Sequence, residues 1–219
     1  MKRSAVKIAF LFLTLPLIFP LVSCSARTDY ADYISEYRSE IYRGDKDGFF
    51  VTAYCTAREY PYRDDGVCAR MEEVVQLIFS APENTEEYEI YLSIGGQTFG
   101  GDASFDCVEE TFSFSCSCPR FSEKEVSVEI RYDKTTLSIP LYSVRSGEEA
   151  DISEVVKTVA EEKKEIFSAL KTGHGWAGEI RARLVFEEKC FYFLSLVAQN
   201  GDRYSCLADA TDGRIFAEK

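Results

Sequence analysis

The feature that most constrains the fold is a series of short apolar segments, each the length of one strand, between residues 49 and 145. Val51, Ala53 and Cys55 alternate with their neighbours at a period of two, as expected for a strand with one buried face. Turn residues, such as the glycine pair at 95–96, separate the segments. About seven strands at this spacing predict an antiparallel, immunoglobulin-like β-sandwich.

The residues before this region have a helical pattern, from residue 28 to residue 43. Thr28 is suited to cap such a helix, and Gly44 is suited to end it. One apolar face repeats at helical spacing through Tyr30, Ile34, Tyr37 and Ile41. The sequence therefore predicts a short N-terminal amphipathic helix.

After a polar stretch at 144–150, a C-terminal unit is predicted over residues 151–219. Asp151 and Glu154 have the spacing of a capping box and begin a helix that reaches about residue 172. Strands are then expected at 179–187, 190–198, 203–208 and 214–217, with a two-residue hairpin turn at Asn200-Gly201. The fold class expected for the whole chain is α+β: an N-terminal helix, a β-sandwich, and a helix plus an antiparallel β-meander.

The end of this unit carries a family resemblance. The apolar run 191–196, the Asn200-Gly201 turn and the segment 207–215, Leu-Ala-Asp-Ala-Thr-Asp-Gly-Arg-Ile, resemble the last strands of PepSY-type modules. The helix at 151–172 lies where such a module has one. The resemblance covers about 65 residues and implies a regulator or inhibitor of an envelope protease.

The first residues form a targeting segment. Lys2, Arg3 and Lys7 precede an apolar run from residue 8 to residue 22, which is shorter than the roughly 20 residues of a transmembrane helix. Leu21-Val22-Ser23-Cys24 resembles the bacterial lipobox. That resemblance implies a signal peptide at 1–23, removed before Cys24, and a diacylglyceryl (palmitate-containing) anchor on the Cys24 thiol. The alternative is an ordinary secreted protein cut near Ala26.

The lipobox also implies a location, the extracytoplasmic face of the cell membrane. In a bacterium with two membranes, Ser25 resembles the residues of lipoproteins that are sorted to the outer membrane. Residues 24–48 would then be the acylated cysteine, a short tether and the amphipathic helix. The overall layout resembles uncharacterised surface lipoproteins of Gram-positive anaerobic bacteria, which implies location and little chemistry.

The charge balance restricts the class of partner. Removing the signal changes the formal net charge from −12 to −15, because the signal contains three basic and no acidic residues. Phosphate backbones and anionic headgroups repel such a surface, so neither nucleic acid nor anionic lipid is expected as a partner. A membrane contacted through the lipid, an envelope protein or a small ligand stays compatible with this charge, and the oligomeric state is open.

Seven cysteines remain once Cys24 is assigned to lipid, and an odd number cannot all pair within one chain. Most are expected to be core thiols. Cys107 with Cys116 or Cys118 is the candidate disulfide. No metal site is expected, because Cys-x-Cys is not the usual zinc spacing and a fourth ligand is not apparent. The predicted hairpin turn places Cys206 opposite Ser195, too far from Cys190 for a bridge.

No motif of nucleophilic, zinc-dependent or phosphate-binding catalysis occurs in the sequence. His174 and Trp176 follow the long helix in a glycine-rich loop, where they are either a helix-capping loop or part of a binding surface. We therefore expect a membrane-anchored binding module without catalysis and without a cofactor other than the acyl anchor. The alternatives are the PepSY-like regulator and an envelope hydrolase with a carboxylate pair.

Overall fold

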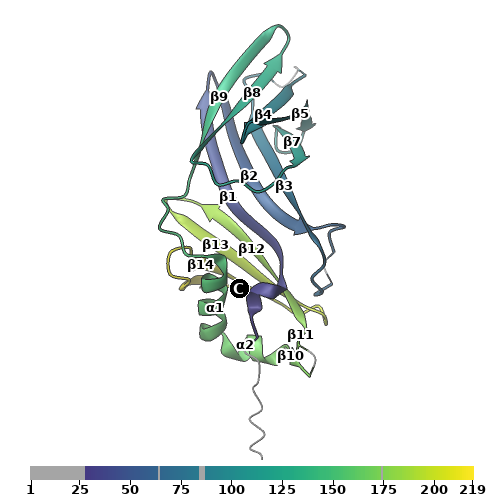
Figure 1. Ribbon diagram of the computed structural model, residues 1–219, viewed down its shortest axis with the longest axis vertical. Helices are drawn as coiled ribbons and strands as arrows, with labels where there is room; N and C mark the ends of the chain where they lie inside the picture. The colour runs from purple at the N-terminus through teal and green to yellow at the C-terminus, as the bar shows by residue number, and fades with distance from the viewer. Residues whose placement is uncertain (1–27, 64, 84–86, 174) are drawn as a thin grey trace, which may run out of the picture.

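The computed structural model describes residues 28–63, 65–83, 87–173 and 175–219. Strands dominate it, and helix is confined to two short segments and one 3-10 turn. The expected α+β fold is therefore wrong. In its place the chain forms one large sheet that curls at one end into a nearly closed, barrel-like shape and is covered by helices at the other (Figure 1).

The curled end of the sheet contains the strands predicted from alternation. Their bounds are β2 (Phe49–Glu59), β3 (Met71–Ser80), β4 (Glu89–Ile94), β5 (Gln97–Asp102), β6 (Ser104–Asp106), β7 (Thr111–Ser117), β8 (Glu125–Tyr132) and β9 (Thr135–Ser143). The Gly95-Gly96 hairpin is confirmed, since Ile94 pairs with Gln97 and both glycines have positive φ.

These strands do not form the two separate layers of an immunoglobulin-like sandwich. From β1 (Ile34–Lys46), one row runs through β2, β3, β7 and β6, and the other runs through β9, β8, β4 and β5. The rows meet where β5 and β7 face each other without pairing. There Gly101 lies against the Phe114 ring, which a Cβ atom on residue 101 would approach to 3.0 Å. We call this region, β2–β9 with the second half of β1, the curled sheet.

Aromatic side chains fill the inside of the curled sheet. Phe49 and Phe79 are almost fully buried. The Phe79 ring stacks on Phe112 with centroids 5.3 Å apart, and Tyr88 meets Phe112 edge to face at 4.7 Å. Such pairs stabilise the fold beyond the burial of their area, so this aromatic cluster contributes to the stability of the curled end.

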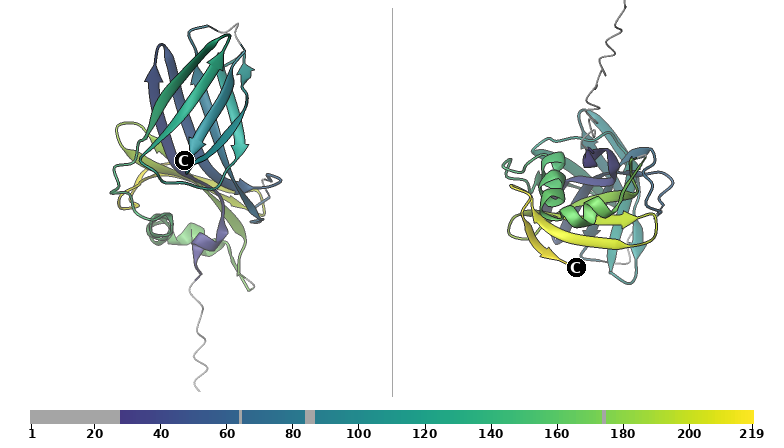
Figure 2. Two further views of the ribbon diagram at one scale, coloured as in Figure 1. Left: turned by 45° about the horizontal axis from the view of Figure 1, so that its top comes forward. Right: turned by 90° about the horizontal axis from the view of Figure 1, so that it is seen from below.

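The other end of the sheet is a meander covered by helices, and we call it the helix-covered sheet. Its strands, beside the first half of β1, are β12 (Gly178–Phe186), β13 (Cys190–Ala198), β14 (Arg203–Asp209) and β15 (Ile215–Glu218). The helices α1 (Ile152–Glu162) and α2 (Lys164–Ala169) lie on the face away from the curled sheet (Figure 2). A separate two-stranded sheet, β10 (Lys171–Thr172) with β11 (Gly175–Trp176), follows α2.

Helix α1 begins where the sequence predicts. The Asp151 side chain accepts a hydrogen bond from the Ser153 amide at 2.8 Å, so it is the N-cap. Val155, Val156 and Val159 are buried against the sheet. Within the parts of the chain that the structure describes, neither helix has the length and apolar composition needed to cross a bilayer.

The predicted N-terminal helix at 28–43 is wrong. Only η1 (Tyr30–Tyr33) is helical, as a 3-10 turn, and the chain then enters the long strand β1. The pairing register of β1 shifts between Arg38 and Glu40, which is a β-bulge. Ile34 and Ile41 would point to opposite faces of a regular strand, but both lie in the core of the helix-covered sheet. The irregular strand therefore imitates helical spacing.

Gly44 has a different role from the predicted helix stop. It lies inside β1 where β9 approaches closely, and a Cβ atom there would come within 2.2 Å of the Pro140 carbonyl oxygen. Just beyond it β1 pairs with the start of β2, where Lys46 lies opposite Phe49. The first half of β1 pairs with β12 and the second half with β9, so one strand belongs to both ends of the sheet.

The hairpin between β13 and β14 is one residue longer than predicted. Gly201 donates to Ala198, and Ser195 pairs with Ser205, so Cys206 lies opposite Leu194 and not Ser195. The predicted separation of Cys190 and Cys206 is confirmed, because the two residues lie at different levels of the ladder and both thiols are free.

Candidate functional site

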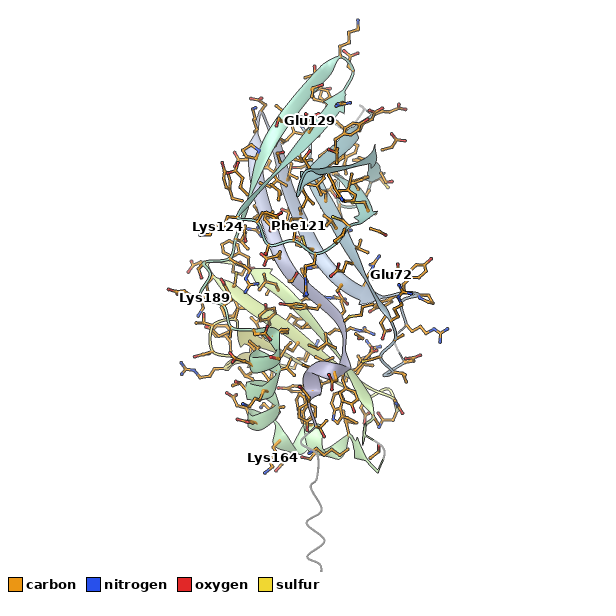
Figure 3. All side chains as sticks on the ribbon, viewed as in Figure 1. Glu72, Phe121, Lys124, Glu129, Lys164 and Lys189 are labelled. Carbon is orange, nitrogen blue, oxygen red and sulfur yellow. The ribbon has the colours of Figure 1, made fainter. Side chains whose placement is uncertain are left out.

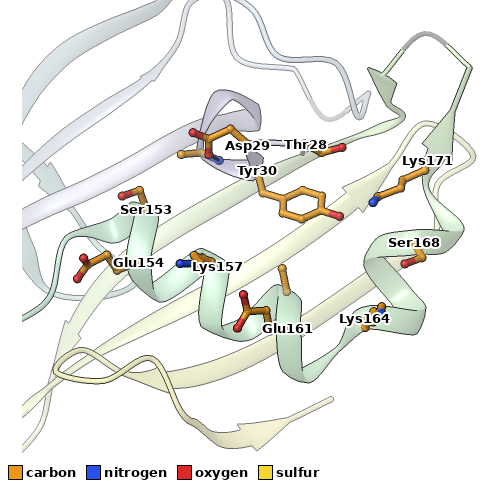
Figure 4. A pocket seen from close by; sticks show the side chains of 12 residues that line it. Thr28, Asp29, Tyr30, Ser153, Glu154, Lys157, Glu161, Lys164, Ser168 and Lys171 are labelled. Carbon is orange, nitrogen blue, oxygen red and sulfur yellow. Dashed lines mark hydrogen bonds between the residues drawn. The ribbon is translucent and has the colours of Figure 1, made fainter. Parts of the chain in front are cut away.

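The described residues form hollows at the two ends of the molecule. The first, the helical-end groove, has a volume of about 750 Å³ and lies between η1 and the helices (Figure 4). Its lining residues are Thr28, Asp29, Tyr30, Ala31, Ser153, Glu154, Lys157, Ala160, Glu161, Lys164, Ser168 and Lys171.

Aromatic contacts fix η1 beside α2 and so shape this groove. The Tyr30 ring meets Phe167 edge to face at 4.8 Å and Trp176 at 5.5 Å. The Tyr33 hydroxyl accepts a hydrogen bond from the Trp176 backbone N–H at 3.2 Å. The first described residues of the chain are thus held against the helices, with the Tyr30 hydroxyl pointing toward Lys171 (Figure 4).

One wall of the helical-end groove carries three lysines at intervals of seven residues, Lys157, Lys164 and Lys171. All three are exposed, and none has a carboxylate within 4 Å among the described residues. Lys163, in contrast, pairs with Glu218 at 2.5 Å. The groove therefore presents ammonium groups that the fold itself does not use.

The predicted binding residues of the glycine-rich loop are not brought together at the surface. His174 lies outside the described residues. Trp176 is only 5% exposed, and its indole N–H donates to the Phe167 carbonyl oxygen at 2.9 Å. The Trp176 ring stacks on Phe167, so it is a core residue and not a surface contact. The interpretation of Trp176 as a binding residue is wrong.

The second hollow, the hairpin-end groove, has a volume of about 1030 Å³ and lies at the far end of the curled sheet. Its aromatic residues are Tyr88, Phe105, Phe112 and Tyr132, of which Phe105 is 43% exposed. Its charged residues are Glu87, Glu89, Asp102, Arg131, Asp133 and Lys134. The Phe105 and Phe112 ring centroids lie 4.8 Å apart, which gives the groove an apolar floor inside a mainly acidic rim.

Sequence reasoning missed both grooves. The lysine spacing was visible in the sequence, but only the packing of η1 against α2 turns it into one wall of a groove. The hairpin-end groove depends on curling, which brings the ends of β4, β5, β6, β8 and β9 together from positions up to 49 residues apart. No local pattern contains that information.

The seven cysteines in the described region are all free thiols, so the candidate bridge from Cys107 to Cys116 or Cys118 is not formed. Cys107 is exposed, whereas Cys116 is partly buried and Cys118 is buried. Burial raises the pKa of the Cys116 thiol to about 11 and that of Cys68 to about 12. Both groups therefore stay protonated at neutral pH and are poor nucleophiles. Among the described residues, no group of three or more ligating side chains is placed to hold a metal ion.

Two carboxylates lie close under the loop between β2 and β3, and they are the nearest arrangement to the predicted hydrolase pair. Glu59 and Glu179 are 2% and 0% exposed. Glu59 accepts from the Ala69 amide, and Glu179 pairs with Arg181 at 2.5 Å. Burial raises the pKa of Glu179, although Arg181 opposes this. Because both groups are enclosed by the chain, they do not line a cleft that a glycoside could enter.

Comparison of the chain with models of known families and with curated proteins finds no match. The geometry of the two grooves is thus the main basis for a functional proposal.

Proposed function

We propose that this protein is an exported lipoprotein, held at the extracytoplasmic face of a membrane through Cys24, that acts by binding a partner at the hairpin-end groove. One observation carries the proposal: the chain enters the fold at the helical end, and the larger groove lies at the opposite end (Figure 1). A lipid-anchored chain with this layout presents the hairpin-end groove away from the bilayer.

The tether to the membrane is short. Four residues lead from Cys24 to Thr28, the first described residue, and such a segment reaches at most about 14 Å. The two acyl chains of a diacylglyceryl group give stable anchoring, whereas a single chain would not. The helical end therefore lies beside the membrane, and the long axis of the molecule carries the hairpin-end groove outward.

The chemistry of the hairpin-end groove indicates the class of partner. Phe105 offers an exposed ring, and the rim has four carboxylates against Arg131 and Lys134. Arg131 is already engaged by Glu129 at 3.0 Å. A basic segment of an envelope protein with an apolar or aromatic side chain fits this surface best, because ring stacking and charge complementarity act together.

Anchoring is tested by metabolic labelling with a palmitate analogue. The wild-type protein should take up label and sediment with membranes, and Cys24→Ala should take up none. Cys107→Ala is the matched control, because Cys107 is the exposed thiol among the described cysteines. Equal labelling of the wild type and the Cys24 variant would refute the anchor.

Binding is tested by a photo-crosslinking side chain placed at Phe105 in intact cells. Position 50 is the control, because Phe50 is 64% exposed on β2 but does not line the hairpin-end groove. We expect one discrete adduct from position 105 and none from position 50. Identical adducts, or none from either, would count against the groove as the binding site.

A second candidate function, a PepSY-like regulator of an envelope protease, has one observation in its favour. Helix α1 packs across the β12–β14 meander, the arrangement that the resemblance implies. In this case purified protein should slow peptide hydrolysis by envelope extracts. An unchanged rate would remove this candidate and leave the first unaffected.

A further inference from the structure

The helical-end groove has a charge pattern that differs from the rest of the molecule. The groove is lined by three carboxylates, on Asp29, Glu154 and Glu161, and by three lysines, so its formal charges balance. The mature chain as a whole has a formal net charge of −15. An anionic bilayer repels most of this surface. The helical-end groove is the exception, and it also lies where the chain would leave the membrane.

The three lysines are available for an external anion. Lys157, Lys164 and Lys171 have no ion-pair partner among the described residues, while Lys189 pairs with Asp209 and Lys163 with Glu218. Lys157 lies in α1, Lys164 begins α2 and Lys171 begins β10, and all three line the same groove. Figure 3 shows Lys164 at the extreme helical end, far from Glu129 on the curled sheet.

We propose that Lys157, Lys164 and Lys171 contact the phosphate groups of anionic phospholipids in the membrane that holds the acyl anchor. This inference rests on the proposed function, because the reach from Cys24 to Thr28 is what brings the groove to the headgroup layer. The acyl group keeps the protein at the membrane, and the lysines orient it. The hairpin-end groove then stands away from the bilayer and does not tumble about the tether.

The first test is lysine labelling of the lipidated protein on two kinds of vesicle, one of phosphatidylcholine alone and one containing phosphatidylglycerol as well. On the anionic vesicles, acylation of the three lysines should slow by about fivefold or more. Lys124 and Lys134, exposed on the curled sheet, should react at the same rate on both. High salt should abolish the difference.

The outcomes separate the two proposals. A protein that floats with neither kind of vesicle lacks the anchor, and the proposed function fails. A protein that floats with both kinds, with equal lysine rates on each, is anchored but not oriented by the lysines, and only the present inference fails. Equal slowing of Lys134 would show general crowding at the surface and would also overturn it.

The second test measures orientation in a triple variant, Lys157→Gln, Lys164→Gln and Lys171→Gln. A dye on the exposed Cys107 reports its distance from acceptors in the bilayer by energy transfer. On anionic vesicles the wild type should show low transfer and the variant higher transfer. The control is Lys46→Gln, Lys124→Gln and Lys134→Gln, three exposed lysines of the curled sheet, which changes the net charge equally and should match the wild type. If it rises equally, net charge and not the groove sets the orientation.

Discussion

The two ends of this sheet bury their apolar residues in different ways. The curled sheet closes on itself, so its strands supply both walls of the core around Phe49, Phe79 and Tyr88. The helix-covered sheet stays open and needs α1, α2 and η1 to shield Tyr192 and Leu194. The first arrangement depends on contacts between distant strands, and the second depends on a single cover held by a few side chains. Both regions share β1, so a substitution that destabilises one region is expected to destabilise the other.

The largest expected effect tests that coupling. Phe49→Ala in the curled sheet and Phe167→Ala in the helix-covered sheet each remove a fully buried ring and should lower the free energy of unfolding by about 3–5 kcal/mol. Trp176, the single tryptophan, reports on the helix-covered sheet. Because β1 joins both cores, Phe49→Ala should move the urea midpoint of Trp176 fluorescence together with that of circular dichroism. A Trp176 midpoint that stays in place would show that the two ends unfold separately.

A smaller effect is expected at the connection between the two regions. Burial raises the pKa of Glu149, but hydrogen bonds from the Ser146 and Gly147 amides lower it to about 2. Arg145 joins this carboxylate to Glu40 on β1. Glu149→Gln should therefore cost about 2–3 kcal/mol at neutral pH.

The sign of the pH dependence follows from the lowered pKa. The stabilisation is present above the ordinary value for glutamate, 4.5, and is lost as the pH falls toward 2. The difference in unfolding free energy between the wild type and Glu149→Gln should shrink over that interval. A difference that stays constant from neutral pH to pH 2 would contradict the stabilisation assigned to the ionised Glu149 carboxylate.

The start of the helical cover should matter less. Asp151→Ala removes the cap of α1 and should cost about 1 kcal/mol, while Asp151→Asn keeps an accepting oxygen and should cost little. Thermal unfolding of the two variants compares them directly. An equal loss in both would attribute the effect to the charge of Asp151 and not to its hydrogen bond with Ser153.

The smallest effect is expected at the edge of the helix-covered sheet. Lys163 and Glu218 form an ion pair with side chains 27% and 48% exposed. Lys163→Ala should change stability by no more than about 0.5 kcal/mol, and salt should remove the difference. A loss well above this would mean that Lys163 has a structural role at the break between α1 and α2.

The sequence predicts local elements well where one rule decides the outcome. Gly95-Gly96 gives its hairpin because both residues tolerate positive φ, and Asp151 gives its cap because a short acceptor suits that position. The same level of reasoning fails for β1. Its buried residues serve two cores, and the bulge between Arg38 and Glu40 brings Ile34 and Ile41, at helical spacing in the sequence, into the same core.

The contacts by which non-consecutive strands close the fold could not be predicted from the sequence pattern. Neither the approach of Gly101 to Phe114 nor the close passage of Pro140 over Gly44 follows from alternation, because each joins strands that are not consecutive in the sequence. Trp176 shows the same limit. In sequence it lies in a glycine-rich loop, yet the turn folds it back onto Phe167, where its indole N–H has a partner. The two grooves arise from these closures, so no motif predicts them.

The central claim is that Cys24 ties the helical end to a membrane and leaves the hairpin end free. The most direct measurement is mass spectrometry of the N-terminal fragment of the protein extracted from cell membranes. The account predicts a chain that begins at Cys24 and carries diacylglycerol on its thiol. A chain that begins near Ala26, or that retains Met1 with an unmodified Cys24, would contradict it.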